Sequence, residues 1–274
     1  MPDAHGLRVR RIGCTALAAT RRSANAHPVR DSGASPYCSI DGEVVWLGCT
    51  AGAMHPRAVM LSGPLEPGRR HIRLDLQGAR AWHPPARSEA CLSVREVAER
   101  LAGIRARLVP PAPATGFGGL LLGAKPAFPL ALAMPHVRAL ASAYRDDCAE
   151  DAFTASLPLL GLGPGLTPSG DDLVGAALFA RRSIARFDER WESVARALAA
   201  ESSRCGSTVS AALFSDLAAG QTFEPLHRLA QALSNGAEAA DAVVPELLAI
   251  GHSSGWDMLA GFMLGAGSGL AAGF

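Results

Sequence analysis

The 274-residue sequence has almost no lysine and almost no net charge, and the second of these narrows the classes of protein that it can encode. Of its 26 basic residues only Lys125 is a lysine, a bias that we attribute to genome composition rather than to function. The formal net charge is +1, so no bulk field draws the chain to nucleic acid or to a membrane surface. We therefore expect no nucleic-acid partner and no membrane partner.

Cysteine motifs are also missing. The six cysteines stand at positions 14, 38, 49, 91, 148 and 205, and no two of them form a CxxC pair or a Cys/His ligand spacing. This spacing argues against a structural zinc site. Scattered cysteines in a chain of this length favour reduced thiols in a cytoplasm over a disulfide framework.

Two apolar stretches fall short of targeting or membrane segments. Ile12 to Ala19 follows a pair of arginines but is brief and stops at Arg21-Arg22, unlike a signal peptide. Residues 256–274 contain one charge, Asp257, but their glycines and the lack of basic flanks favour a tightly packed buried helix over a membrane span. We therefore expect a cytoplasmic protein.

The residues that are abundant are apolar, at 49% of the chain with a mean hydropathy of +0.16, which predicts a globular core. Residues 1–87 look β-rich, with strands expected within 7–20, 40–62 and 72–76 and a hairpin turn at Asp41-Gly42. A small sheet or barrel is predicted. His55-Pro56-Arg57 lies in a loop between strands, where it either reaches a ligand or, as we favour, is a turn with a solvated base.

Residues 88–127 form a connecting segment. The apolar spacing of 88–108 predicts a helix, and the prolines at 110–113 end it. A glycine-rich turn follows at 115–119. Because it lacks the other features of a phosphate loop, we interpret it as a bend or a close packing point.

Residues 128–274 are predicted to be almost entirely helical and rich in Ala and Gly. The fold class is therefore α+β, a β-rich N-terminal part followed by a helical C-terminal part. The expected helices cover 130–146, 149–159, 171–186, 188–203, 206–219, 223–235, 239–250 and 256–272.

The most specific stretch is Gly161 to Leu178, GLGPGLTPSGDDLVGAAL. A glycine-rich loop runs into a helix start that either Thr167 or Ser169 can cap. With Ser169 as N-cap, Asp172 falls at the third helical position, close to a capping box. The pattern predicts a loop that presents free N–H groups and two carboxylates at one helix start.

The same pattern occurs twice. Ser169-Gly170-x-Asp172 resembles Ser254-Gly255-x-Asp257, and each is followed by two large and two small apolar residues. Either a good capping solution is used twice, or two helix N-termini converge on one pocket, where their N–H groups and dipoles would bind an anion. We favour the second interpretation, which predicts that the two serines and the two aspartates lie close together.

The chemistry of such a pocket depends on its carboxylates. Asp171 and Asp172 would repel an anion unless a cation such as Mg²⁺ offsets them, or one could cap while the other faces the pocket as a base. Adjacent helical residues point about 100° apart, so these two are not expected to do the same job. His252 is the other candidate for proton transfer. Ser207 and Thr208 either cap a further helix or line the same pocket.

The candidate site is the following set. Catalytic roles are predicted for Asp171, Asp172 and His252, with Mg²⁺ on Asp171 and Asp172. Ligand binding is predicted for Gly163, Gly165, Thr167, Ser169, Gly170, Ser207, Thr208, Ser253, Ser254, Gly255 and Asp257.

Three motifs together resemble a known family. They are the 161–178 stretch, STVSAALFSDLAAGQ at 207–221 and IGHSSGWDMLAGFMLG at 250–265, and they are similar to the bacterial family that contains the AllH subunit of oxamate carbamoyltransferase. The resemblance implies a multi-subunit enzyme of allantoin and purine breakdown. Such an enzyme interconverts oxalurate plus phosphate with oxamate plus carbamoyl phosphate, beside FdrA-like and AllG-like subunits.

Two functions follow as expectations. The first is an enzyme subunit whose pocket binds carbamoyl phosphate, phosphate or an oxamate-like anion between the two helix starts. The second is a non-catalytic binding or assembly subunit in which the glycine loops serve packing.

Overall fold

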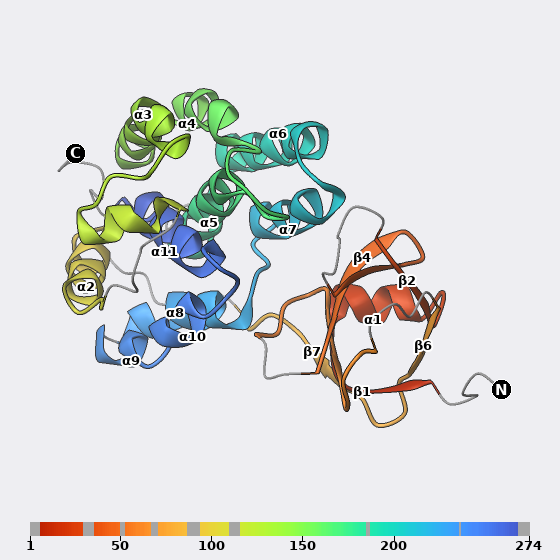
Figure 1. The fold of residues 1–274 in the computed structure, drawn as a ribbon. Helices are drawn as coiled ribbons and strands as arrows, with labels where there is room; N and C mark the ends of the chain where they lie inside the picture. Colours follow the sequence, from red (N-terminus) through yellow and green to blue (C-terminus); the bar gives the residue numbers. More distant parts are fainter. Residues whose placement is uncertain are drawn as a thin grey trace. The chain divides into compact units, whose positions relative to one another are not determined.

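The structure is a computed structural model that describes residues 6–29, 36–49, 53–66, 71–86, 94–109, 116–184, 187–235 and 237–267. The chain divides into two compact units, Met1–Pro85 and Ala86–Phe274. Strands make up most of the first unit and helices make up the second (Figure 1). The predicted order, a β-rich part followed by a helical part, is confirmed.

The first unit is a small barrel. Its strands pair in the order β5-β4-β3-β2-β6-β1-β7, and a further pairing of β5 with β1 closes six of them into a ring, to which β7 adds on β1. Valine, isoleucine and leucine side chains of alternate strand positions fill the interior. The strands are β1 (Leu7–Gly13), β2 (Asn25–Pro28), β3 (Tyr37–Ile40), β4 (Glu43–Gly48), β5 (Ala58–Leu61), β6 (Ile72–Asp75) and β7 (Arg80–Trp82).

The predicted hairpin is present between β3 and β4. Ile40 pairs with Glu43, and the two turn residues have positive φ, 48° at Asp41 and 82° at Gly42. A two-residue loop with both φ values positive matches the right-handed twist of the flanking strands, which is why Asp-Gly predicted it.

One predicted strand is half wrong. Within 7–20 only β1 is extended, and Cys14–Thr20 forms the helix α1. Ala16 and Ala19 are fully buried in the barrel core, and alanine favours a helix once its small side chain is packed. Gly13 lies at the transition, where an added Cβ would stand 2.2 Å from the carbonyl oxygen of His55.

The prediction of a solvated base at His55-Pro56-Arg57 is wrong. The His55 side chain is 2% exposed and Arg57 is 9% exposed. The Arg57 guanidinium donates to the carboxylate of Glu43 at 3.0 Å, and burial lowers the pKa of His55 to about 3, with a smaller effect from the charge of Arg57. A buried charge persists when it is paired, so this segment is part of the barrel's packing.

The second unit consists of helices that follow the predicted boundaries closely, except at 239–250 and at the end of 256–272. The expected helix at 239–250 is two short helices, because Pro245 begins the second of them and cannot continue the first. The elements are α2 (Val94–Ala106), η1 (Gly116–Leu122), η2 (Leu130–Ala133), α3 (Met134–Arg145), α4 (Ala149–Ser156), η3 (Leu157–Leu159), α5 (Ser169–Ile184), α6 (Glu189–Cys205), α7 (Thr208–Ala218), α8 (Glu224–Asn235), α9 (Ala237–Asp241), α10 (Val244–Leu248) and α11 (Ser254–Gly265).

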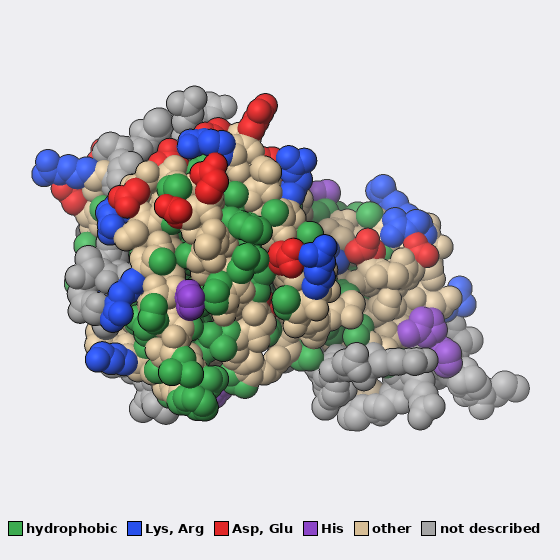
Figure 2. Space-filling model, turned by 90° about the horizontal axis from the view of Figure 1, so that it is seen from above, with side chains coloured by type: hydrophobic (Ala, Val, Ile, Leu, Met, Phe, Trp, Pro, Cys, Tyr) green, Lys and Arg blue, Asp and Glu red, His purple; other side chains and the backbone are tan. Residues whose placement is uncertain are grey.

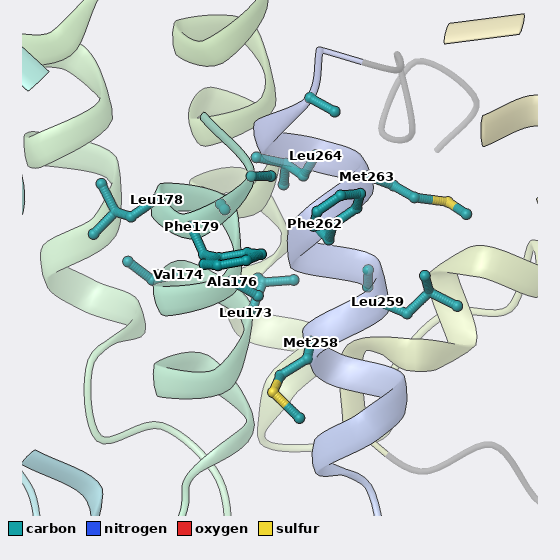
Figure 3. Packing of buried hydrophobic residues seen from close by; sticks show 14 of the residues in the cluster. Leu173, Val174, Ala176, Leu178, Phe179, Met258, Leu259, Phe262, Met263 and Leu264 are labelled. Carbon is teal, nitrogen blue, oxygen red and sulfur yellow. The ribbon is translucent and has the colours of Figure 1, made fainter. Parts of the chain in front are cut away.

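The helices α5 and α11 form the centre of this unit, with the other helices around them (Figure 1). Every residue from Ser169 to Ala180 and from Gly255 to Gly265 is buried. A helix that is apolar all round is a core helix rather than a surface one. Large side chains from both helices interlock in the core, including Phe179 and Phe262, whose ring centroids lie 6.3 Å apart (Figure 3).

Two glycines let the central helices approach each other. An added Cβ at Gly261 would stand 2.1 Å from the carbonyl oxygen of Leu173, and one at Gly265 would stand 2.1 Å from that of Ala177. Positions four apart share one helix face, so the two glycines form one contact strip. The backbones of α5 and α11 therefore touch directly.

The near-zero net charge of the sequence is reflected in the distribution of charged side chains on the surface. On the face shown in Figure 2, basic and acidic side chains are interspersed. Within the described ranges, no helix has the length and apolar character needed to cross a membrane. The helix predicted at 256–272 begins at Ser254 and ends at Gly265, since Ala266 is its C-cap and Gly267 has φ 74°; residues from 268 onward lie outside the described ranges.

Candidate functional site

The start of α5 differs from the predicted cap. The carbonyl of Pro168 accepts the N–H groups of Asp171 at 2.9 Å and Asp172 at 3.1 Å, so Pro168 is the N-cap and Ser169 is the first helical residue. The prediction that Thr167 or Ser169 is the N-cap of this helix is therefore wrong. The Ser169 hydroxyl is engaged elsewhere, since it hydrogen-bonds the carboxylate of Asp257.

The two Ser-Gly-x-Asp segments exchange hydrogen bonds. Ser169 on α5 bonds Asp257 on α11, while Ser254 on α11 bonds Asp172 on α5. The hydroxyl of Thr167 lies 3.0 Å from that of Ser254 and also bonds Asp172. The predicted proximity of the two helix starts is confirmed. We call this set, Thr167, Ser169, Asp172, Ser254 and Asp257, the junction.

The sequence predicted free backbone N–H groups at these helix starts, but in the structure the N–H groups of both glycines are hydrogen-bonded. The N–H of Gly170 donates to the carbonyl of Leu162 at 2.9 Å, and the N–H of Gly255 donates to that of Ile250 at 3.0 Å. Both glycines also sit against a preceding carbonyl, since an added Cβ would be 1.8 Å from Leu159 at position 170. The equivalent distance at position 255 is 2.0 Å, from the carbonyl oxygen of Leu247. These N–H groups hold the loops in place and are not available to an anion.

Asp171 faces away from the junction, toward the glycine loop and α7. One of its oxygens accepts the N–H of Gly161 at 2.7 Å, and the other accepts the hydroxyl of Ser210. The expectation that Asp171 and Asp172 serve different purposes agrees with this arrangement. Each oxygen of Asp171 accepts one hydrogen bond, and Mg²⁺ on Asp171 and Asp172 stays a prediction. Among the described residues, no group of three or more His, Cys, Asp or Glu side chains could hold a metal ion.

The start of α7 is hydrogen-bonded to the glycine-rich loop that precedes α5. Ser207 caps α7 by accepting the N–H of Ser210 at 3.0 Å, and its hydroxyl donates to the carbonyl of Leu166 at 3.0 Å. Thr208 is exposed. Ser210 was not among the predicted site residues, although the three hydroxyls of GSTVS were the signal that marked this helix start.

A fourth segment reaches the junction from far away in the sequence. The N–H groups of Phe117 and Gly118, in η1, donate to one carboxylate oxygen of Asp257 at 2.5 and 3.2 Å. Gly116 has φ 71°, and an added Cβ there would be 2.3 Å from the same oxygen. The glycine-rich turn was interpreted as close packing. The packing is present, but the two donors to Asp257 were missed.

The remaining predicted residues lie around the rim. Gly163 has φ 123° and rests against Ser169, while Gly165 has φ 96°, is exposed and borders open space. Ser253 hydrogen-bonds Asp257, whereas His252 is exposed on the turn before α11. The structure thus brings Ser253 to the buried carboxylates, and the catalytic role of His252 stays a prediction.

Burial governs the acidity of the three carboxyl groups. It raises the pKa of Asp172 well above its usual range, and the charge of Asp257 raises it further. Burial also raises the pKa of Asp257 to about 6, against the opposing hydrogen bonds from Ser169 and Ser253. The pKa of Asp171 is raised by burial and lowered by the bonds from Ser210 and Gly161. Burial therefore shifts both junction carboxyl groups toward their protonated form.

One oxygen of each junction carboxyl has no hydrogen-bond partner. These are Oδ2 of Asp172 and Oδ2 of Asp257, both buried. None of the ion pairs among the described residues involves either aspartate. The arrangement thus offers proton-binding oxygens without a compensating positive side chain.

Comparison with known proteins connects this geometry to a family. Residues 159–266 match the family model described as oxamate carbamoyltransferase subunit AllH. No solved structure matches the chain. The matched segment runs from the end of η3 past α11 and contains the glycine loop, α7 and all five junction residues. This segment, which builds the candidate site, is the part of the chain that is similar to the AllH family.

Proposed function

We propose that this chain is a subunit of a carbamoyltransferase complex and that the junction is its small-molecule site. The complex would interconvert oxalurate plus phosphate with oxamate plus carbamoyl phosphate, together with FdrA-like and AllG-like subunits. The family match supports the carbamoyltransferase part of the proposal. The observation that supports the site is the pair of buried carboxyl oxygens of Asp172 and Asp257 that lack partners.

The expected ligand is carbamoyl phosphate or an oxamate-like molecule. We had expected its anionic group at the helix N-termini, but the N–H groups of Gly170 and Gly255 are occupied and three carboxyl groups lie nearby. Like charges in a buried region repel strongly. The anionic end of the ligand is therefore better placed outside the junction, toward the exposed Gly165 or a partner subunit.

Activity of the complex tests this proposal. The chain would be combined with its FdrA-like and AllG-like partners, and carbamoyl phosphate would be measured after addition of oxalurate and phosphate. Asp172→Asn should lower the rate by about 100-fold or more if the junction binds or protonates the substrate. Asp151→Asn, at an exposed position of α4, is the matched control and should leave the rate unchanged.

The assembly of the complex separates the two candidate functions. A non-catalytic assembly role is favoured by one observation, that the junction hydrogen bonds and glycine contacts hold α5 to α11. If that role is the whole function, Asp172→Asn complexes that elute intact on size exclusion should keep full activity. A wild-type complex that is intact but makes no carbamoyl phosphate would rule out the carbamoyltransferase assignment.

A further inference from the structure

Two buried carboxyl oxygens at the junction need a partner that the described protein does not supply. Asp172 is 6% exposed and Asp257 is 0% exposed, and Oδ2 of each has no hydrogen bond. Native proteins leave few buried polar atoms unsatisfied, and the exceptions commonly mark a function or a bound group. Oδ1 of Asp257 accepts the N–H groups of Phe117 and Gly118, and the Asp172 carboxyl group is bonded by hydroxyls. Only the two Oδ2 atoms remain for a ligand.

The charges around them restrict the class of that ligand. An anion is disfavoured, because neither aspartate has a basic partner among the described ion pairs. A divalent metal ion is disfavoured as well, since the described residues supply no third acidic or imidazole ligand. A neutral group that forms hydrogen bonds remains.

The two carboxyl groups differ in which proton state their surroundings favour. Asp257 accepts two backbone N–H groups, those of Phe117 and Gly118, which stabilise a carboxylate. Asp172 is held by the hydroxyls of Thr167 and Ser254 and lies within the field of Asp257. Two neighbouring buried carboxyl groups share one proton more readily than they ionise together. Asp172 is therefore the group that keeps the proton, and its free oxygen becomes a donor.

A site with one donor and one acceptor matches the edge of an amide. We propose that Asp172 and Asp257 bind the O=C–N–H edge of a carboxamide or ureido group, with the Asp172 O–H donating to the carbonyl and the Asp257 carboxylate accepting the N–H. This inference rests on the proposed function, in which every carbamoyl-bearing reactant has such a group. It assigns the junction to the amide end of the ligand rather than to its anionic end.

The loop before α5 borders solvent on one side and the junction on the other. Gly165 is exposed with open space beside it, and Thr167, two residues later, is half-buried and already contacts Asp172. In the proposed complex the amide edge lies at the junction and the charged end of the ligand lies toward Gly165.

Matched ligand pairs test the inference on the full chain and on its complex. Oxamate and oxalate differ in an amide against a carboxylate, and carbamoyl phosphate and acetyl phosphate differ in NH₂ against CH₃. A site that hydrogen-bonds an N–H discriminates strongly against an analogue that lacks it. We expect calorimetry, or inhibition of the complex, to show at least tenfold tighter binding of oxamate and of carbamoyl phosphate than of their counterparts.

Variants locate the preference at the junction. Asp257→Asn, which replaces the free acceptor by an N–H₂ donor or forces the amide to turn, should remove the tenfold preference, and Asp151→Asn should retain it. Equal binding within each ligand pair, or binding of neither pair, would overturn the inference. The outcome is separate from that of the proposed function: an active complex that binds oxamate and oxalate equally refutes only the amide assignment. An inactive complex that still prefers oxamate refutes only the carbamoyltransferase assignment.

Discussion

The starts of α5 and α11 share a sequence pattern but hold their carboxyl groups differently. Asp257 accepts two backbone N–H groups from η1 as well as hydroxyls, whereas the bonds to Asp172 come from hydroxyls. Between serine and aspartate, α5 has Asp171, which bonds Ser210 of α7. At the same position α11 has Trp256, whose Cβ would be 2.4 Å from a Cβ added at Gly118.

This difference shows how one pattern can produce two chemical behaviours. Backbone N–H donors are fixed in place and favour an ionised carboxylate, while a hydroxyl can rotate and serve either protonation state. The shared Ser-Gly-x-Asp pattern therefore sets the position of each carboxyl group. The segment that packs against it sets how readily the group ionises.

Substitution of the glycine in each Ser-Gly-x-Asp pattern tests whether the two helix starts are packed equivalently. These substitutions should have the largest effect on the free energy of unfolding. Gly170→Ala and Gly255→Ala would each place a Cβ within 2.0 Å of a backbone carbonyl oxygen. Because backbone cannot move aside as a side chain can, each change should lower the free energy of unfolding by at least about 3 kcal/mol. Urea unfolding of the two variants should give similar losses.

A third glycine in the same core is the control. At Gly175, also in α5, the nearest atom to an added Cβ is the flexible end of Leu217 at 2.7 Å, so Gly175→Ala should cost far less. If Gly255→Ala is as mild as Gly175→Ala while Gly170→Ala is severe, the two helix starts are not equivalent in packing.

Much of the junction could be predicted because its information is local. Ser-Gly-x-Asp before an apolar run marks a helix start, and its repetition indicated that Ser169 and Ser254 occupy comparable places. Asp41-Gly42 identified the barrel hairpin for the same reason, since the turn residues alone determine that backbone.

What the sequence could not supply depends on partners that are remote along the chain. Phe117 donates to Asp257 across 140 positions, and no local pattern predicts that contact. The carbonyls of Leu162 and Ile250 occupy the N–H groups that a helix start normally leaves free. Arg57 was expected in solvent because turn residues usually are, but Glu43 and the barrel core hold it.

The pH dependence of the free energy of unfolding tests how readily Asp257 ionises in the folded chain. The pKa of Asp257 is raised from 3.8 to about 6 in the folded chain, so between these values the unfolded chain has lost a proton that the folded chain retains. The free energy of unfolding therefore falls as pH rises from about 4 to about 6, by about 2 to 3 kcal/mol from this group, and is constant above. Below pH 4 Asp257 is protonated in both the folded and the unfolded chain, so it no longer lowers the free energy of unfolding.

Subtraction of pH profiles measures this contribution together with the effect of the Asp257 charge on Asp172. Asp257→Asn cannot ionise, so its free energy of unfolding should lack that fall, and the difference between wild type and variant should change between pH 4 and 6. The lowered pKa values of His55 and His227 act in the opposite direction but are common to both proteins and cancel. A difference that is flat over this range would contradict the assignment of a raised pKa to Asp257.

The two serines should give the smallest effect, and it follows from the same asymmetry. Ser254→Ala removes a hydroxyl from Asp172, whose bonds come from hydroxyls, while Ser169→Ala leaves Asp257 with both backbone N–H donors. A buried polar group that loses a partner costs about 1 to 3 kcal/mol, and less when other donors remain. Urea unfolding should therefore give a loss of about 1.5 kcal/mol for Ser254→Ala and about 0.5 kcal/mol for Ser169→Ala. Ser203→Ala, on the exposed side of α6, sets the baseline, and equal losses at 254 and 169 would mean that backbone donors do not distinguish the two carboxyl groups.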